Sequence, residues 1–255
     1  ESNNSKAEVM TQDFKIVIPA RLNSSRLPRK VLLDIAGKPL VQHVYERCLK
    51  VGASEVIVAT DSDEVLNVVK TFTADVLMTN PQHASGTDRV AEVAAIRGWA
   101  PATPVVNVQG DAPMIPPESV RQVADLLLAN PDAAIATLCV PIVSAAEYAD
   151  PNVVKVVFDQ HGRALYFSRA SIPSNAREPE HLPTAWRHLG LYGYRVAALE
   201  ELTQTAPCEL ELVERLEQLR AMWLGMEIRI APAAVPNGPD VDTPEDLEQV
   251  RKLLA

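Results

Sequence analysis

Short apolar runs alternate with segments of helical periodicity along the first half of this 255-residue chain. Apolar runs bounded by turn residues predict buried strands, and apolar residues spaced three or four apart predict helices. Strands are expected at 16–20, 55–60, 75–78, 104–108 and 134–141, and helices at 40–51, 63–72, from 85 onward and at 117–129. Repeated strand–helix–strand units predict an α/β fold with an open, mostly parallel sheet and helices on both faces.

The pattern changes after residue 141. Segments 153–158 and 164–168 flank Asp159-Gln-His-Gly162, which is typical of a hairpin turn. A polar loop at 172–183, a strand at 189–194, a long helix at 209–224 and a strand at 227–231 follow. Thr243-Pro244-Glu245-Asp246 predicts the start of a last helix, with a cap, a proline and two acids in the first turn. We therefore expect one domain over 14–255 with an antiparallel excursion at about 142–195.

Bulk properties exclude several classes of protein. The formal net charge of −9 argues against a general nucleic-acid binder. No apolar run approaches the ~20 residues that span a bilayer, so no membrane association is expected. Residues 1–13 are polar without a secretory signal and predict a flexible tail or cloning remnant. Cys48, Cys139 and Cys208 are far apart, which indicates neither a disulfide framework nor a zinc site and favours a cytoplasmic location.

A basic loop after the first strand is the strongest chemical signal. Five basic side chains fall between Lys15 and Lys30, and no acid interrupts them before Asp34. A loop at the carboxyl end of a parallel strand lies at the edge where such sheets bind ligands. Fixed cations there suit a polyphosphate, although a solvated basic loop is the plainer alternative. The chain has neither a P-loop nor a G-x-G-x-x-G motif, so phosphates would be held by side chains together with backbone N–H groups.

Two aspartates stand at comparable positions. Gln109-Gly110-Asp111 ends the strand at 104–108, and Asp242 directly precedes the last predicted helix. Glycine permits close backbone approach, and a carboxylate at the ligand edge suits Mg²⁺, which takes few carboxylates plus phosphate oxygens. Taken singly, each aspartate could instead cap a turn or helix. Two of them beside one polyphosphate loop favour a metal site.

Seven stretches together resemble the sugar-acid cytidylyltransferases, most closely the branch that acts on 3-deoxy-manno-octulosonate (Kdo). They are Ile18–Pro28, Ser85–Arg89, Val106–Asp111, Ala164–Arg169, Arg187–Tyr194, Leu216–Arg220 and Val241–Leu247, in family order over residues 14–251. The resemblance implies a Rossmann-like nucleotidyltransferase fold. It also implies the reaction CTP + Kdo → CMP-Kdo + pyrophosphate, which serves lipopolysaccharide biosynthesis.

The resemblance implies a role for each matching residue. Arg21, Arg26 and Lys30 would hold the CTP phosphates, and Ser85, Gly86 and Thr87 would line the cytosine pocket. Asp111 and Asp242 would bind Mg²⁺ and form the catalytic set with Arg21 and Lys30. The sugar acid would be held by Gln109, Arg169, His188, Tyr192, Glu217 and Gln218. The excursion would supply much of the sugar pocket and a homodimer interface.

Several alternatives stay open on the residues alone. Arg29 and Val31 stand where the family usually has glycine and proline, and Ala112 stands where it often has glutamate. These departures keep open a catalytically silent nucleotide-binding paralogue, and an 8-amino Kdo analogue or a sialic acid is the nearest alternative substrate. A dehydrogenase is disfavoured by the missing glycine fingerprint. Without the resemblance, Arg169, His188, Glu217 and Gln218 could be ordinary surface or core residues.

Overall fold

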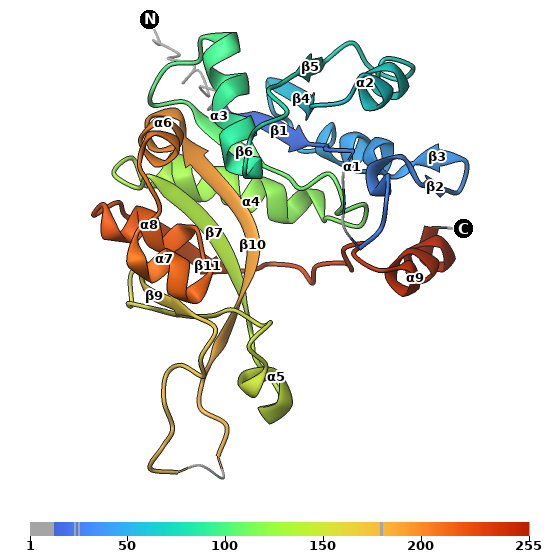
Figure 1. Cartoon of the computed structure of the whole chain (residues 1–255). Coiled ribbons are helices and arrows are strands. Elements are labelled where there is room, and N and C mark those ends of the chain that lie inside the picture. Colours follow the sequence, from blue (N-terminus) through green and yellow to red (C-terminus); the bar gives the residue numbers. More distant parts are fainter. Residues whose placement is uncertain (1–12, 23, 25, 179–180, 255) are drawn as a thin grey trace, which may run out of the picture.

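A computed structural model gives the structure and describes residues 13–22, 24, 26–178 and 181–254. Figure 1 shows one twisted sheet with helices packed on its faces. The strands are β1 (Lys15–Pro19), β2 (Asp34–Ile35), β3 (Lys38–Pro39), β4 (Glu55–Thr60), β5 (Val76–Met78), β6 (Pro104–Asn107), β7 (Ile135–Pro141), β8 (Lys155–Phe158), β9 (Ala164–Ser168), β10 (Trp186–Arg195) and β11 (Ile228–Pro232). The helices are α1 (Leu40–Cys48), α2 (Asp63–Val69), α3 (Gly86–Arg97), α4 (Pro117–Ala129), α5 (Ala145–Ala149), α6 (Val196–Gln204), α7 (Glu209–Glu214), α8 (Gln218–Trp223) and α9 (Pro244–Leu254), with a 3₁₀ turn η1 (Lys30–Leu32).

The main sheet has the strand order β11-β7-β10-β6-β1-β4-β5. Neighbouring strands are parallel except β10, which runs antiparallel to both β6 and β7. The predicted α/β class is therefore confirmed. β1 and β6 lie side by side and parallel, so their carboxyl ends deliver the basic loop and Gln109-Gly110-Asp111 to the same edge.

Alternating side chains tie the sheet to two helical layers. In β1, Ile16 and Ile18 pack into one apolar cluster, whereas Val17 packs into the other. The first cluster includes buried residues of α1, α2, α4 and α9, and the second includes buried residues of α3, α6 and α8. The period-two alternation of a strand thus places helices on both faces, as the sequence pattern predicts.

The second half departs from the predicted elements in two places. The single helix expected at 209–224 is wrong: α7 ends at Glu214, Arg215 has a left-handed backbone (φ 54°), and α8 starts at Gln218. The strand expected at 189–194 is longer, and its last part lies inside the main sheet between β6 and β7. The predicted hairpin is confirmed, because β8 and β9 pair antiparallel across a turn with Gly162 at φ 77°.

The expected start of the last helix is also confirmed. The Thr243 hydroxyl accepts from the Asp246 amide (3.2 Å), and the Asp246 carboxylate accepts from the Thr243 amide (2.8 Å). Within the described residues, no helix is long and apolar enough to cross a membrane.

Candidate active site

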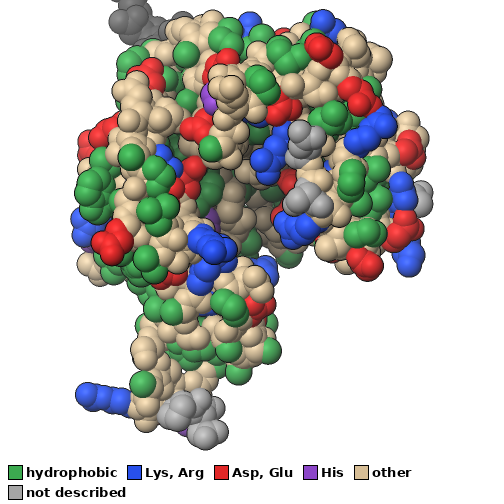
Figure 2. Space-filling model, viewed as in Figure 1, with side chains coloured by type: hydrophobic (Ala, Val, Ile, Leu, Met, Phe, Trp, Pro, Cys, Tyr) green, Lys and Arg blue, Asp and Glu red, His purple; other side chains and the backbone are tan. Residues whose placement is uncertain are grey.

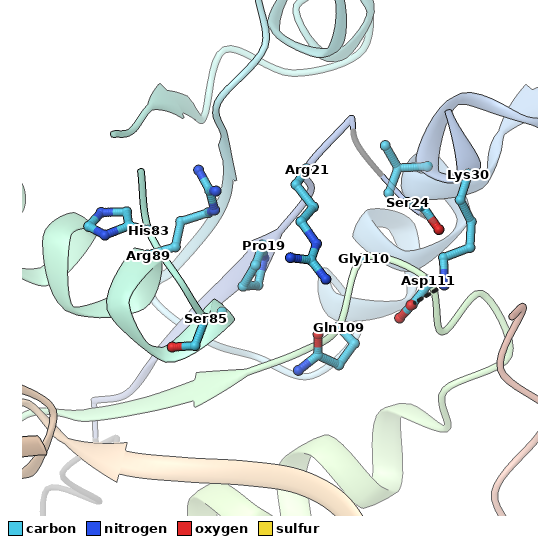
Figure 3. A pocket seen from close by; sticks show the side chains of 12 residues that line it. Pro19, Arg21, Ser24, Lys30, His83, Ser85, Arg89, Gln109, Gly110 and Asp111 are labelled. Carbon is cyan, nitrogen blue, oxygen red and sulfur yellow. Dashed lines mark hydrogen bonds and ion pairs between the residues drawn. The ribbon is translucent and has the colours of Figure 1, made fainter. Parts of the chain in front are cut away.

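A hollow at the carboxyl edge of β1 and β6 gathers much of the predicted nucleotide site. Figure 3 shows the Arg21 guanidinium aimed at Gln109 and Gly110, between Ser85 on one side and the Lys30–Asp111 pair on the other. The space-filling view shows basic and acidic side chains next to each other along the rim of a central depression (Figure 2). The hollow is lined by Pro19, Arg21, Ser24, Lys30, Val31, His83, Ser85, Gly86, Arg89, Gln109, Gly110 and Asp111. Asn23 and Ser25 of the basic loop lie outside the described residues.

Gly110 brings the two strand ends together. Its amide donates to the Pro19 carbonyl (3.2 Å), and a Cβ at position 110 would lie 2.5 Å from that oxygen. Backbone cannot yield at such a distance, so only glycine fits there. This close approach fixes Gln109 and Asp111 against the start of the basic loop.

The amino end of α3 forms the opposite wall. The Ser85 hydroxyl accepts from the Asp88 amide (3.1 Å), and the Asp88 carboxylate accepts from the Ser85 amide (2.9 Å), which together make a capping box. The amides of Gly86 and Thr87 belong to the same first turn, where the helix dipole favours a negatively charged group. Ser85 and Gly86 line the hollow, whereas the buried Thr87 hydroxyl donates to Glu217.

Lys30 joins the two predicted metal ligands. Its ammonium donates to Asp111 Oδ2 (2.6 Å) and to Asp242 Oδ1 (2.8 Å), although the two acids are far apart in sequence. Burial acts to lower the pKa of Lys30, but the two carboxylates outweigh it and the net pKa is raised. The Arg26 guanidinium lies 3.1 Å from Asp242 Oδ2, so the exposed Arg26 pairs with one of the two acids. The pair is therefore charge-balanced by lysine and arginine.

Asp240 is a third acid beside this pair that the sequence reasoning missed. Partial desolvation, and then repulsion from Asp111 and Asp242, raise the pKa of Asp240 to about 6, although the residue is exposed. Its spacing of two residues from Asp242 was the available signal. Asp240 also lines a second hollow, together with Arg187 and His188.

His188 and Tyr192 lie together on β10. The His188 Nε2 atom is 2.8 Å from the Thr137 hydroxyl, and its ring lies 5.0 Å from those of Phe167 and Tyr192. Burial lowers the pKa of His188 to about 3, so the ring is neutral at physiological pH. Burial also raises the pKa of Tyr192. Both side chains can therefore offer neutral hydrogen bonds and ring surface.

The remaining predicted sugar residues are divided among different surroundings. Gln109 is exposed at the hollow, whereas Glu217 contacts Thr87 at the start of α3. Gln218 is buried, with 7% of its surface exposed. Arg169 lies at the end of β9, and each of its three guanidinium nitrogens donates to a backbone carbonyl. Arg169 does not line the hollow.

The two family departures have local explanations. Arg29 adopts a left-handed backbone (φ 57°), a conformation that suits glycine, and its guanidinium contacts Glu64 in α2. The additional positive charge of Arg29 is thus paired with Glu64 on α2. Ala112 is 5% exposed within the first apolar cluster, where a glutamate would have to be buried.

His83 and Arg89 line the hollow but were not predicted. His83 Nε2 lies 2.6 Å from Glu92, and the buried Arg89 pairs with Asp61 (2.8 Å). Both side chains are thus committed to acids of the protein. Arg89 was visible in the Ser85–Arg89 stretch, but its burial depends on packing against the loop after β4.

Comparison with known proteins agrees with this geometry. The family model for cytidylyltransferases matches residues 15–228. The 3-deoxy-manno-octulosonate cytidylyltransferases of Thioalkalivibrio sulfidiphilus and Vibrio vulnificus are 50% and 51% identical, covering 94% and 95% of this chain and 98% of each relative. A solved CMP:2-keto-3-deoxy-manno-octonic acid synthetase complexed with CTP superposes with a TM-score of 0.87 at 46% identity, covering 94% of this chain and 98% of that one. With the family model matched over residues 15–228 and near-complete coverage by these relatives, the chain belongs to the cytidylyltransferases.

Proposed function

We propose that this protein transfers the cytidylyl group of CTP to Kdo, giving CMP-Kdo and pyrophosphate for lipopolysaccharide biosynthesis. The observation that carries the proposal is the hollow in which the basic loop, the start of α3 and Gly110-Asp111 converge. Its fit to a nucleoside triphosphate is supported by the CTP complex of the structural relative. The relatives' names support Kdo as the acceptor in preference to other acidic sugars.

Phosphate binding is assigned to side chains that already face the hollow. Arg21 presents a guanidinium fork, and Lys30 presents an ammonium beside Asp111 in the same hollow. The amide groups at the start of α3 add partial positive charge on the opposite wall. These groups would hold the triphosphate and stabilise the charge that builds up on pyrophosphate as it leaves.

Asp111 and Asp242 fit a magnesium ion. Their oxygens converge on one cation, the Lys30 ammonium, and two carboxylates are a usual protein contribution to Mg²⁺. The described residues contain no cluster of three or more His, Cys, Asp or Glu side chains placed to hold a metal, so water and substrate oxygens would complete the shell. When bound, Mg²⁺ would supply Lewis-acid neutralisation of phosphate charge.

The proposed reaction is an in-line displacement. The anomeric hydroxyl oxygen of Kdo forms a bond to the α-phosphorus, the bond from that phosphorus to the bridging oxygen breaks, and the hydroxyl proton passes to water. His188 is a poor general base, because its pKa is about 3 and its Nε2 atom contacts Thr137. Catalysis by the chain thus rests on positioning and on charge stabilisation.

Two further properties are proposed with the function. A homodimer is supported by exposed apolar side chains on the neighbouring β9 and α7, namely Leu165, Leu212 and Val213, and sedimentation equilibrium would test it. A cytoplasmic location is supported by three buried cysteines that form no disulfide.

Pyrophosphate release tests the function directly. With CTP and Mg²⁺, we expect release only when Kdo is added, and much less with sialic acid or an 8-amino Kdo analogue. Saturable CTP binding with no release for any sugar would contradict the proposal and favour a silent binding protein. Equal release with sialic acid would contradict the choice of sugar alone.

A further inference from the structure

Arg169 is bound to the protein by all of its nitrogens. Nε donates to the Glu214 carbonyl (2.8 Å), one terminal nitrogen to the Pro151 carbonyl (3.0 Å) and the other to the Arg215 carbonyl (3.4 Å). A bidentate contact to a sugar carboxylate needs two neighbouring nitrogens. Each nitrogen of Arg169 already donates to the backbone, so a carboxylate would have to use the second N–H of the two terminal nitrogens.

The Glu214 side chain also bonds to the end of β9. Its carboxylate accepts from the Arg169 amide (2.9 Å) and from the Ser168 hydroxyl (2.6 Å). The fully buried Lys155 in turn donates to the Arg169 carbonyl (2.6 Å). These bonds hold the end of β9 against the end of α7, which lies beside it in Figure 1. We call the contacts of Arg169 with Glu214 and Arg215 the clasp.

The clasp acts where the chain is strained. Arg215 holds φ 54° although it carries a Cβ, and the sequence from 209 to 224 has the pattern of one continuous helix. A left-handed residue between two six-residue helices persists only if surrounding contacts hold it. The Arg215 and Leu216 amides both donate to the Glu211 carbonyl and close the turn locally, and the Arg169 contacts to the carbonyls of residues 214 and 215 hold it from outside α7.

The break sets the position of Glu217. Directly after the turn, the Glu217 carboxylate accepts from the Thr87 hydroxyl and lies 3.8 Å from Arg220. Thr87 belongs to the first turn of α3, whose cap Ser85 lines the phosphate hollow. In an unbroken helix, Glu217 would point in a different direction and lose Thr87.

We propose that Arg169 is a positioning residue: it holds the left-handed break between α7 and α8 so that Glu217 faces the start of α3, and it affects Kdo binding through Glu217 and not by contact with the sugar carboxylate. The proposal rests on the proposed function for its kinetic consequence. Its structural part, the clasp, stands on the hydrogen bonds alone.

Arg169→Ala and Glu214→Ala test the clasp from its two sides. Each should raise the KM for Kdo roughly tenfold, as expected for losing hydrogen bonds to a charged group, and leave CTP binding within about twofold. Arg163→Ala, which removes an exposed arginine of the same hairpin, is the matched control and should leave both values unchanged. The preference for Kdo over its C1 carboxamide should survive in both clasp variants.

Arg215→Gly supplies the decisive rescue. Glycine adopts the left-handed conformation without penalty, so adding Arg215→Gly to Arg169→Ala should bring the KM for Kdo most of the way back to the wild-type value. Failure of this rescue, an unchanged KM in both clasp variants, or loss of the preference for the carboxylate in Arg169→Ala would overturn the proposal. If Arg169→Ala does not fold, Glu214→Ala with and without Arg215→Gly decides by the same criteria.

Two readouts separate this inference from the proposed function. Kdo-dependent pyrophosphate release by the wild type tests the function by itself. Hydrogen exchange without substrates tests the clasp: the amide of Leu216, bonded to the Glu211 carbonyl, should exchange faster in Arg169→Ala and recover in the Arg215→Gly double variant. Unchanged exchange would refute the clasp whatever the enzyme does.

Discussion

At the scale of single residues, His188 shows how burial fixes a protonation state. Its ring packs against Phe167 and Tyr192, and its Nε2 atom contacts Thr137. Burial lowers its pKa from 6.5 to about 3. The unfolded chain binds a proton at this side chain below pH 6.5, whereas the folded chain does not until about pH 3. The contribution of His188 to stability is therefore complete above pH 6.5 and is lost as the pH falls toward 3.

This linkage predicts an acid-sensitive stability. Between pH 6.5 and 5, the wild type should lose up to about 2 kcal/mol of unfolding free energy through His188, at most about 1.4 kcal/mol per pH unit. His188→Asn should lack this component, while His161→Asn, at an exposed turn, should keep it. Urea unfolding at several pH values measures the difference. Parallel pH dependences in wild type and His188→Asn would show that the ring is free to protonate when folded.

At the scale of elements, the close contact between the ends of β1 and β6 predicts a strict requirement for glycine. Gly110→Ala would place a Cβ 2.5 Å from the Pro19 carbonyl, so the strand ends must separate. We expect a loss of about 1–3 kcal/mol in stability, as for other overpacked sites, and a fall in kcat because Asp111 moves. Gly86→Ala is the control for stability alone, since its Cβ would meet Pro19 at an ordinary 3.7 Å. Thermal melting and pyrophosphate release measure the two effects, and a fully stable Gly110→Ala protein would contradict this reading.

Elements with strong local periodicity could be predicted from sequence, and elements defined by distant contacts could not. The α4 bounds of 117–129 are as predicted, because Pro117 and an amphipathic pattern mark the helix. The break at Arg215 was invisible because it depends on Arg169, which lies 46 residues away along the chain. The resemblance placed Arg169 in the sugar site, and for the same reason its contacts to the carbonyls of residues 214 and 215 could not be predicted. That Arg21, Gln109 and Asp111 line one hollow could be predicted, because they follow the ends of strands that a parallel sheet brings together.

At the scale of the whole molecule, the acid pair joins the first half of the chain to its C-terminal segment. Asp111 follows β6, whereas Asp242 arrives on the segment that crosses from β11 to α9 in Figure 1. The Val241 amide donates to the Asp111 carbonyl (3.0 Å), and Leu247 and Val250 bury α9 against the first apolar cluster. The packing of α9 therefore positions one of the two carboxylates, and the fold as a whole must form before the pair exists.

Because the two carboxylates converge on one cation position, they should act as a unit. Asp111→Asn and Asp242→Asn should each lower kcat by roughly 100-fold or more, since several kcal/mol of charge stabilisation is at stake. The double variant should be little worse than either single one, as for groups that work together. Calorimetry in the absence of Mg²⁺ should show that the Asp111 and Asp242 variants still bind CTP in part, because Arg21 and the start of α3 remain. The control variant Asp132→Asn, on an exposed turn, should match the wild type. If the fold-reductions in kcat of the two single variants multiply in the double variant, the aspartates act separately. One of them would then serve the fold through the Lys30 contact and not the transfer reaction.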